Sequence, residues 1–128
     1  MAYLIDTNVA IELRDGNETV ASKIGALDGA VMLSIVSRVE LEGGVYRDPD
    51  LVHLRRPRLD AILSMLPVLP FDDAAADAYR RIVEATGYSR RKLLDRMIAA
   101  QALVHQAYLV TLNGDDFRDI PGLDVVAW

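Results

Sequence analysis

Four acidic residues, Asp6, Glu40, Asp95 and Asp116, stand at positions where an ordinary surface charge is hardest to justify. They lie far apart in the chain, yet each adjoins an apolar run that is typical of a buried strand or helix. Carboxylates that converge on one place repel one another unless a cation joins them, and Mg²⁺ and Mn²⁺ prefer hard oxygen ligands. A metal ion held by a few carboxylates, with open coordination positions, is suited to chemistry on phosphates.

Asp95 is the most difficult of the four to explain by structure alone. On a helix, the residues three, four and seven positions further on share its face, and all are apolar: Ile98, Ala99 and Ala102. A carboxylate on that face points toward the core, where burying it unpaired is costly or neutralises it. A first-turn position near the positive end of the helix gives partial relief. The structural alternative is an ion pair with Arg91 or Arg96.

The other acids have structural alternatives of their own. Asp6 is followed by Thr7-Asn8 and can serve as a turn or cap residue. Ser37 and Glu40 match the S-x-x-E capping box, in which the glutamate bonds back to the N–H of the cap residue. Asp115 and Asp116 can both be loop residues, and chemistry alone does not decide which of them belongs with the other acids.

Composition limits the class of protein. A chain of 128 residues, 52% hydrophobic and 26% charged, is expected to form one domain over 1–128. No apolar run approaches a membrane span, and the start lacks a basic region and a cleavage site, so we expect a cytoplasmic protein without a signal peptide. The absence of cysteine excludes thiolate zinc sites, disulfides and cysteine nucleophiles. With only His53 and His105, neither a histidine-rich metal site nor a paired-histidine ribonuclease mechanism is expected.

The net charge of −5 argues against a general nucleic-acid binder, whose usual mark is a basic face. The positive charges are nevertheless clustered, at Arg55, Arg56 and Arg58 and again in residues 90–96. Either cluster can be a solvated face or a contact to phosphates.

Apolar runs that end in turn or cap signals predict alternating strands and helices. Strands are expected at 3–5, 31–35, 108–112 and 125–127, and a short extended piece at 67–70. Helices are expected at 9–14 after a Thr7 or Asn8 cap, 18–27, 37–46, around 59–66, after Asp72 to Gly87, and 91–107. Pro57 is better suited to the first turn of its helix than to the interior. The alternation predicts a central, mostly parallel sheet covered by helices, whose ligands bind outside the carboxyl ends of the strands. Asp6 and Asp116 follow such ends, and Glu40 lies one helical turn beyond another.

The order of four motifs resembles that of the PIN-domain proteins and, within them, the VapC toxins of type II toxin–antitoxin pairs. The motifs are Leu4-Ile5-Asp6-Thr7-Asn8, residues 34–44 with Glu40-Leu41 before Gly44, residues 95–100, and Val110-Thr111-Leu112-Asn113 followed by Asp116-Phe117, residues 120–123 and Trp128. The resemblance covers nearly the whole chain. One departure is Ser89-Arg90-Arg91-Lys92, where family members often have a loop with glycine and proline.

The resemblance implies a PIN-like three-layer α/β/α fold and an endoribonuclease that depends on Mg²⁺ or Mn²⁺. Carried over by motif, the catalytic and metal-binding acids are Asp6, Glu40, Asp95 and Asp116. The supporting polar residues are then Thr7, Asn8, Ser37 and Asn113. The resemblance also implies a homodimer, inhibition by a cognate VapB antitoxin, and an RNA substrate of the transfer or ribosomal class.

Two other classes of function remain to be compared. A receiver-like phosphoacceptor module is also a parallel α/β protein with acidic strand ends, but it requires an acidic pair after the first strand and a lysine after a late strand. Asp6-Thr7-Asn8 lacks the pair, and residues 110–112 are not followed by lysine. A catalytically inactive PIN domain that serves only as a binding scaffold is disfavoured by the presence of all four acids.

Overall fold

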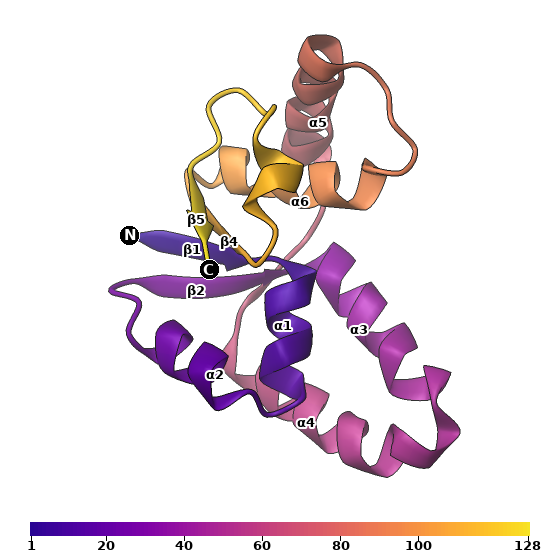
Figure 1. Ribbon diagram of the computed structural model, residues 1–128. Coiled ribbons are helices and arrows are strands. Elements are labelled where there is room, and N and C mark those ends of the chain that lie inside the picture. The colour runs from indigo at the N-terminus through magenta and orange to yellow at the C-terminus, as the bar shows by residue number, and fades with distance from the viewer.

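Five parallel strands form one sheet through the middle of the computed structural model, which describes residues 1–128 (Figure 1). The strands are β1 (Ala2–Ile5), β2 (Ala30–Ser34), β3 (Val68–Leu69), β4 (Tyr108–Thr111) and β5 (Val125–Ala127), and they lie in the order β3-β2-β1-β4-β5. Every neighbouring pair is parallel, so the prediction of a mostly parallel sheet is confirmed, with no antiparallel member.

Helices cover both faces of this sheet and complete a three-layer α/β/α fold. They are α1 (Thr7–Arg14), α2 (Glu18–Gly25), α3 (Ile35–Arg47), α4 (Val52–Met65), α5 (Asp73–Thr86) and α6 (Leu93–Val104), with the 3-10 turns η1 (Pro49–Leu51) and η2 (Gly114–Phe117). In Figure 1, α1, α2 and α4 lie on one side of the sheet, while α5, α6 and η2 lie on the other. None of the helices combines the length and the hydrophobicity that crossing a bilayer requires.

Alternation along the central strands separates two apolar cores. Tyr3 and Ile5 pack in the core with α1, α2, α3 and α4, whereas Leu4 packs in the core with α5 and α6. In β4, Val110 and Leu109 are divided between the same two cores. Because successive side chains of a strand point to opposite faces, short strands without a polar face are buried on both sides.

The strand order creates the position at which a site is expected. From β1 the chain proceeds outward to β2 and then β3, and it returns to the other side of β1 to form β4 and β5. The helices that follow β1 and those that precede β4 therefore lie on opposite faces, and a crevice opens between them at the carboxyl ends of β1 and β4. Asp6 follows β1 directly, and its backbone N–H still donates to the carbonyl of Val110 on β4 (2.8 Å).

A buried amide attaches α6 to the far strands of the sheet. Gln101 is fully buried, and its Nε2 donates to the carbonyls of Leu69 and Pro70 at 3.0 Å each. Its Oε1 accepts a hydrogen bond from the hydroxyl of Ser34 at the end of β2. A buried amide in an apolar interior has few orientations in which all its hydrogen bonds are made. The bonds of Gln101 therefore fix the position of α6, and of Asp95 in its first turn, relative to the sheet.

Two of the predicted helix starts were wrong, for a shared reason. Asp6, rather than Thr7 or Asn8, caps α1, and Ser34, rather than Ser37, caps α3. The hydroxyl of Ser34 accepts from the N–H of Val36 (3.0 Å), so Glu40 lies in the second turn and has no part in a capping box. Each helix begins directly at the end of its strand, with no intervening loop. The cap is therefore the residue at the junction: Asp6 directly after β1, and Ser34 as the last residue of β2.

The remaining boundaries confirm most predictions. Asp72 caps α5 by accepting from Ala75 N–H (2.9 Å), and Gly87 ends it with φ +86°. The helix predicted at 91–107 is shorter, since α6 begins at Leu93 and His105 is its exposed C-cap. Pro57 lies inside α4 and not in its first turn, which is a correction. It is tolerated there because it and His53, whose carbonyl loses a helical partner, are both exposed to water.

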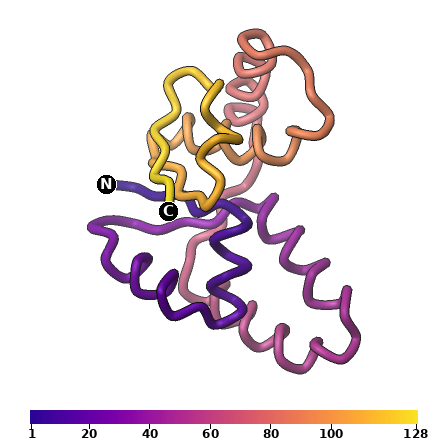
Figure 2. The backbone as a smooth tube through the Cα atoms, in the orientation of Figure 1, coloured from indigo at the N-terminus to yellow at the C-terminus, as the bar shows by residue number.

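The helix predicted around 59–66 contributes to the core. Leu59, Ile62 and Leu66 are buried, and Leu63 packs against them. Figure 2 shows the chain leaving the sheet along α3, turning at η1 and returning along α4, so that α3 and α4 form a helical hairpin beside α1. This hairpin and α1 enclose the space on one side of the carboxyl end of β1.

Candidate metal centre

Asp6 is the most firmly held of the four acids. It is 4% exposed, its Oδ1 accepts from the N–H of Thr7 (2.8 Å), and its Oδ2 accepts from the hydroxyl of Thr111 (2.8 Å). Burial raises the pKa of this carboxyl above its ordinary value, the bonds from Thr111 and Thr7 oppose that shift, and the negative charges of Glu40 and Asp116 add to it. A buried carboxylate with two donors has a fixed position from which to hold a cation.

Glu40 reaches the same place from α3 through a relay of hydroxyls. The hydroxyl of Thr7 donates to Glu40 Oε1 (2.9 Å), and it lies 2.7 Å from the hydroxyl of Ser37. Because Thr7 has one proton to donate and gives it to the carboxylate, Ser37 must be the donor to Thr7. Ser37 is fully buried, whereas Glu40 itself is exposed, so the relay orients a side chain that would otherwise be free to rotate.

Asp95 has no hydrogen bond and no ion pair within the chain, and it is only half-buried in the first turn of α6. Its expected partners are engaged elsewhere or absent. Arg96 is buried and donates to the carbonyl of Gly87 (2.7 Å) and to Asp119 (3.3 Å), and Arg91 is exposed without an ion pair. Burial, and then the charges of Asp6 and Asp116, raise the pKa of Asp95 to about 6, while Lys92 lowers it. The structural alternative for Asp95 is therefore excluded.

The structure separates Asp115 from Asp116. Both belong to η2, but only Asp116 lines the cavity that holds the other three acids. Asp115 points away from it and pairs with Arg118. Asn113, which precedes η2, also lines the cavity, and its N–H donates to the hydroxyl of Thr111 (3.0 Å).

The four acids share one cavity of about 250 Å³. Its lining is completed by Thr7, Asn8, Ile11 and Asn113, so it contains four carboxylates and neither lysine, arginine nor histidine. Four segments remote in sequence supply these side chains: the end of β1, α3, α6 and η2. The convergence follows from the switch in strand order between β1 and β4, because the strands on either side of β1 come from different parts of the chain.

The donor set fits Mg²⁺ or Mn²⁺, since it consists of carboxylate, hydroxyl and amide oxygens alone. No three acidic or histidine side chains stand close enough around one point to hold an ion as they are now placed. Thr7 and Thr111 hold Glu40 and Asp6 by hydrogen bonds, whereas the side chain of Asp95 has none. Closing the site on an ion requires rotation of the exposed Glu40 and Asp116 and of the unbonded Asp95.

Thr111 is the residue of this centre that sequence reasoning missed. It is fully buried at the end of β4, and its hydroxyl links Asp6 to Asn113 N–H. The available signal was a single hydroxyl at the end of the otherwise apolar run 108–112. Of the predicted supporting residues, Thr7 and Ser37 form the relay to Glu40, and Asn8 Oδ1 accepts from Leu112 N–H at 3.4 Å.

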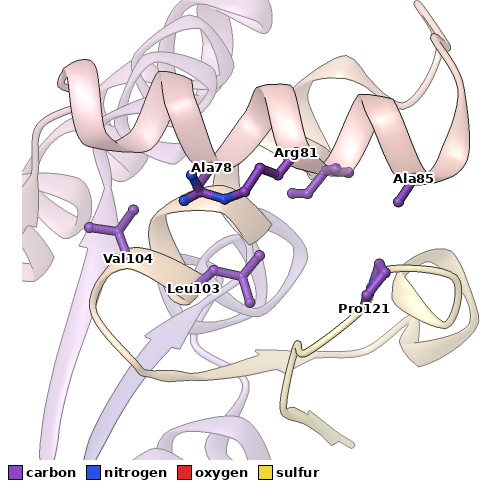
Figure 3. Close-up of a pocket in the computed structure, with 7 residues that line it drawn as sticks. Ala78, Arg81, Ala85, Leu103, Val104 and Pro121 are labelled. Atoms are coloured by element: carbon purple, nitrogen blue, oxygen red, sulfur yellow. The ribbon is translucent and has the colours of Figure 1, made fainter.

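A separate cavity of about 370 Å³ lies between α5 and the end of α6 and contains none of these acids. Ala78 and Ala85 of α5, Leu103 and Val104 at the end of α6, and Pro121 surround it, with Arg81 lying along α5 above it (Figure 3). Its apolar walls contain no group that acts as an acid, a base or a metal ligand.

One family of known proteins matches almost the whole chain. A model described as "PIN domain" matches residues 3–123. The chain belongs to the PIN domain family. A curated relative, "Ribonuclease VapC1" from Rickettsia felis, is 32% identical over 135 residues, which cover 98% of this chain and 96% of the relative. The similarity to a VapC ribonuclease thus extends over nearly the whole of this PIN domain, and the resemblance noted in the sequence is confirmed.

Solved structures of relatives share the fold. The crystal structure of VapBC2 from Rickettsia felis, bound to a DNA fragment from their promoter, superposes with a TM-score of 0.87 at 24% identity, covering 100% of this chain and 99% of that one. The crystal structure of FitAcB from Neisseria gonorrhoeae has a TM-score of 0.78 at 28% identity, covering 96% of this chain and 95% of that one. The predicted three-layer PIN-like fold is confirmed.

We predict that the pKa of Asp95 makes metal-free stability depend on pH. The folded pKa of about 6 exceeds the unfolded value near 3.9, so between these values the folded state binds more protons than the unfolded state. Stability is therefore greatest below about pH 4 with respect to this group, and it falls as the pH rises toward 6. Relative to Asp95→Asn, the unaltered protein should lose melting temperature across this window in EDTA.

Thermal melts at pH 4, 5, 6 and 7 measure this difference. Asp115→Asn is the matched control, since Asp115 is exposed and outside the cavity. Its profile should run parallel to that of the unaltered protein. Parallel profiles for Asp95→Asn as well would contradict the prediction.

Proposed function

We propose that this PIN domain is the toxin of a VapBC-type toxin–antitoxin pair and acts as a Mg²⁺- or Mn²⁺-dependent endoribonuclease. The observation that carries the proposal is the gathering of Asp6, Glu40, Asp95 and Asp116 in one cavity whose lining has no cationic side chain, in a chain 32% identical to a ribonuclease VapC1. Such a cavity is suited to phosphodiester hydrolysis. We place the reaction in the cytoplasm, where its RNA substrate is made.

The side chains divide the work of the site. Asp6 supplies a fixed carboxylate, and the Thr7 relay orients Glu40 toward the same point. Asp95 and Asp116 supply carboxylates free to rotate into place. A bound divalent ion supplies activation of the attacking water and stabilisation of charge on the phosphate. Because no histidine or lysine lines the cavity, a carboxylate is the nearest group of the chain that can accept the proton of that water.

The basic segment before α6 offsets the repulsion between an acidic protein and RNA. Arg90 and Arg91 are exposed and make no ion pair, whereas Lys92 lies 3.9 Å from Asp119. Lys92 is also close enough to Asp95 to lower the pKa of that carboxyl. The segment therefore borders the acidic cavity, and its free guanidinium groups are available to RNA phosphates.

The negative charge of the acidic cavity also indicates how a partner protein would inhibit the site. Two structural relatives are VapBC complexes, from Rickettsia felis and Salmonella typhimurium. A VapB-type antitoxin would silence the site by inserting an arginine, because a guanidinium matches paired carboxylates and is always charged. We expect a homodimer and an RNA substrate of the transfer or ribosomal class. Leu59 and Ile62 of α4 and Leu66 at its C-cap are buried in the core, so these side chains are not available to a partner.

Replacing Asp6, Asp95 or Asp116 by Asn should lower the rate of Mn²⁺-dependent RNA cleavage about 100-fold or more, since each supplies a carboxylate to the ion. Asp115→Asn, the neighbour outside the cavity, should cleave normally. Labelled RNA with Mn²⁺, and with EDTA as the blank, provides the assay.

In EDTA the variants should melt at or above the temperature of the unaltered protein. A loss of more than about 2 kcal/mol would make these acids structural partners. Inactivity of the unaltered protein would leave only a binding module.

Replacing Arg90, Arg91 and Lys92 together by Ala should weaken RNA binding and flatten its salt dependence by about 0.7 per lost contact to single-stranded RNA. Affinity measured across a range of salt concentrations gives the slope. An unaltered slope would mean that the segment makes no contact with RNA phosphates and is a solvated face.

Production of the chain alone should arrest growth, and production with the neighbouring antitoxin gene should restore it. Asp6→Asn should remove the arrest because it disables the site without displacing the fold. Equal growth in all three cultures, at equal levels of soluble protein, would refute the toxin function and leave a milder nuclease.

A further inference from the structure

A second cavity adjoins the acidic one and differs from it in charge. It measures about 480 Å³ and lies between α1 and the α3–α4 hairpin. The two cavities share Thr7, Ile11 and Glu40, so they are neighbouring compartments of one depression. The second compartment contains three arginines, Arg14, Arg47 and Arg55, whereas the acidic one contains none.

Arg14 is held in this compartment with part of its guanidinium unused. Its side chain is 5% exposed, and its Nε donates to Asp15 (3.1 Å). The two terminal nitrogens make no hydrogen bond within the chain. The only fully enclosed side-chain nitrogen or oxygen without a partner is Nε of Arg96, so the terminal nitrogens of Arg14 open to the cavity. Burying a charge with free donors is costly unless an anion completes it.

Two glycines, Gly43 and Gly44, line the compartment together with Arg14. Gly43 and Gly44 are consecutive residues inside α3, where glycine weakens a helix relative to alanine. A Cβ on Gly44 would lie 2.9 Å from Nη1 of Arg14, and one on Gly43 would meet nothing within 4 Å. Gly44 therefore makes room for the guanidinium, and Gly43 adds no side chain to the lining of the compartment.

The other two arginines surround the same space. Arg47 is exposed and makes neither an ion pair nor a side-chain hydrogen bond. Arg55 donates through Nη1 to Asp48 (2.8 Å) and to the carbonyl of Gly44 (2.9 Å), which positions it beside the two glycines. Asp15 and Glu40 are the acids of the lining, and Asp48 beside it pairs with Arg55, so Arg47 is the arginine of the compartment without an acidic partner.

We propose that this arginine compartment binds a phosphate of the RNA strand next to the phosphate held at the acidic cavity. The inference rests on the proposed nuclease function. A strand that places one phosphate at the four acids carries its neighbour across the shared wall of Thr7 and Glu40. Guanidinium nitrogens match phosphate oxygens in pairs, and Arg14 presents two that lack a partner. A protein carboxylate is also negatively charged, but carboxylates do not recur at every unit of a protein chain as phosphates do in RNA.

The first experiment removes a charge at the rim. Arg47→Gln is compared with Arg80→Gln, an exposed arginine of α5 that pairs only with Glu84. Binding of a single-stranded six-nucleotide RNA is measured in EDTA by fluorescence anisotropy across salt concentrations. Arg47→Gln should weaken binding about threefold and reduce the salt slope by about 0.7, while Arg80→Gln should leave both unchanged.

The second experiment moves the buried guanidinium without changing any charge. Gly44→Ala places a methyl group against Nη1 of Arg14, which is the flexible end of its side chain, so the fold is retained. Gly25→Ala is the matched control, because its methyl group would meet nothing within 4 Å and Gly25 lies in α2, outside both cavities. Gly44→Ala should weaken RNA binding about threefold at an unreduced melting temperature, and Gly25→Ala should not.

The two proposals fail separately. Unchanged affinity and salt slope for Arg47→Gln and Gly44→Ala, with full Mn²⁺-dependent cleavage by the unaltered protein, would overturn the phosphate site and retain the nuclease. Arginine-dependent binding without cleavage by the unaltered protein would overturn the nuclease and retain the phosphate site. Absence of any RNA binding by the unaltered protein in EDTA would also overturn the site. So would an equal loss of affinity in the control variants.

Discussion

Repulsion among four carboxylates in one small cavity is the constraint on which the rest of this structure depends. The cavity holds Asp6, Glu40, Asp95 and Asp116 with no cationic side chain in its lining. Desolvation by burial raises the pKa values of Asp6 and Asp95, and the charges of the neighbouring acids raise them further. Such a cluster opposes folding, so the scaffold must hold it by interactions made elsewhere. Two apolar cores and the buried Gln101 amide provide them.

Hydrogen bonds hold some of these acids more firmly than others. Thr111 and the Thr7 N–H fix Asp6, and the Ser37–Thr7 relay guides Glu40. Asp95 has no such partner. A site with fixed and movable carboxylates can relax when no cation is present and close when one arrives. The four acids therefore share one cavity but are not held equally firmly in it.

The distribution of charge matters more here than the net value of −5. Negative charge is concentrated at the strand ends, while the arginine compartment lies on one side and the segment 90–92 precedes the helix that carries Asp95. Within a Debye length of about 8 Å, an RNA strand responds to these local groups rather than to the whole protein. An acidic chain can therefore present a path for a polyanion.

The sequence by itself determined the strands, most of the helices, the parallel α/β class and the acids that meet at the switch point, because these follow from local periodicity and from the position of charges at the ends of apolar runs. Only the tertiary structure decided that Ser34 replaces Ser37 as a cap, that Asp116 rather than Asp115 faces the cavity, and that Thr111 holds Asp6. The arginine compartment was also invisible in the sequence. These features depend on pairs such as Thr111 with Asp6, 105 positions apart, which only the strand order brings together.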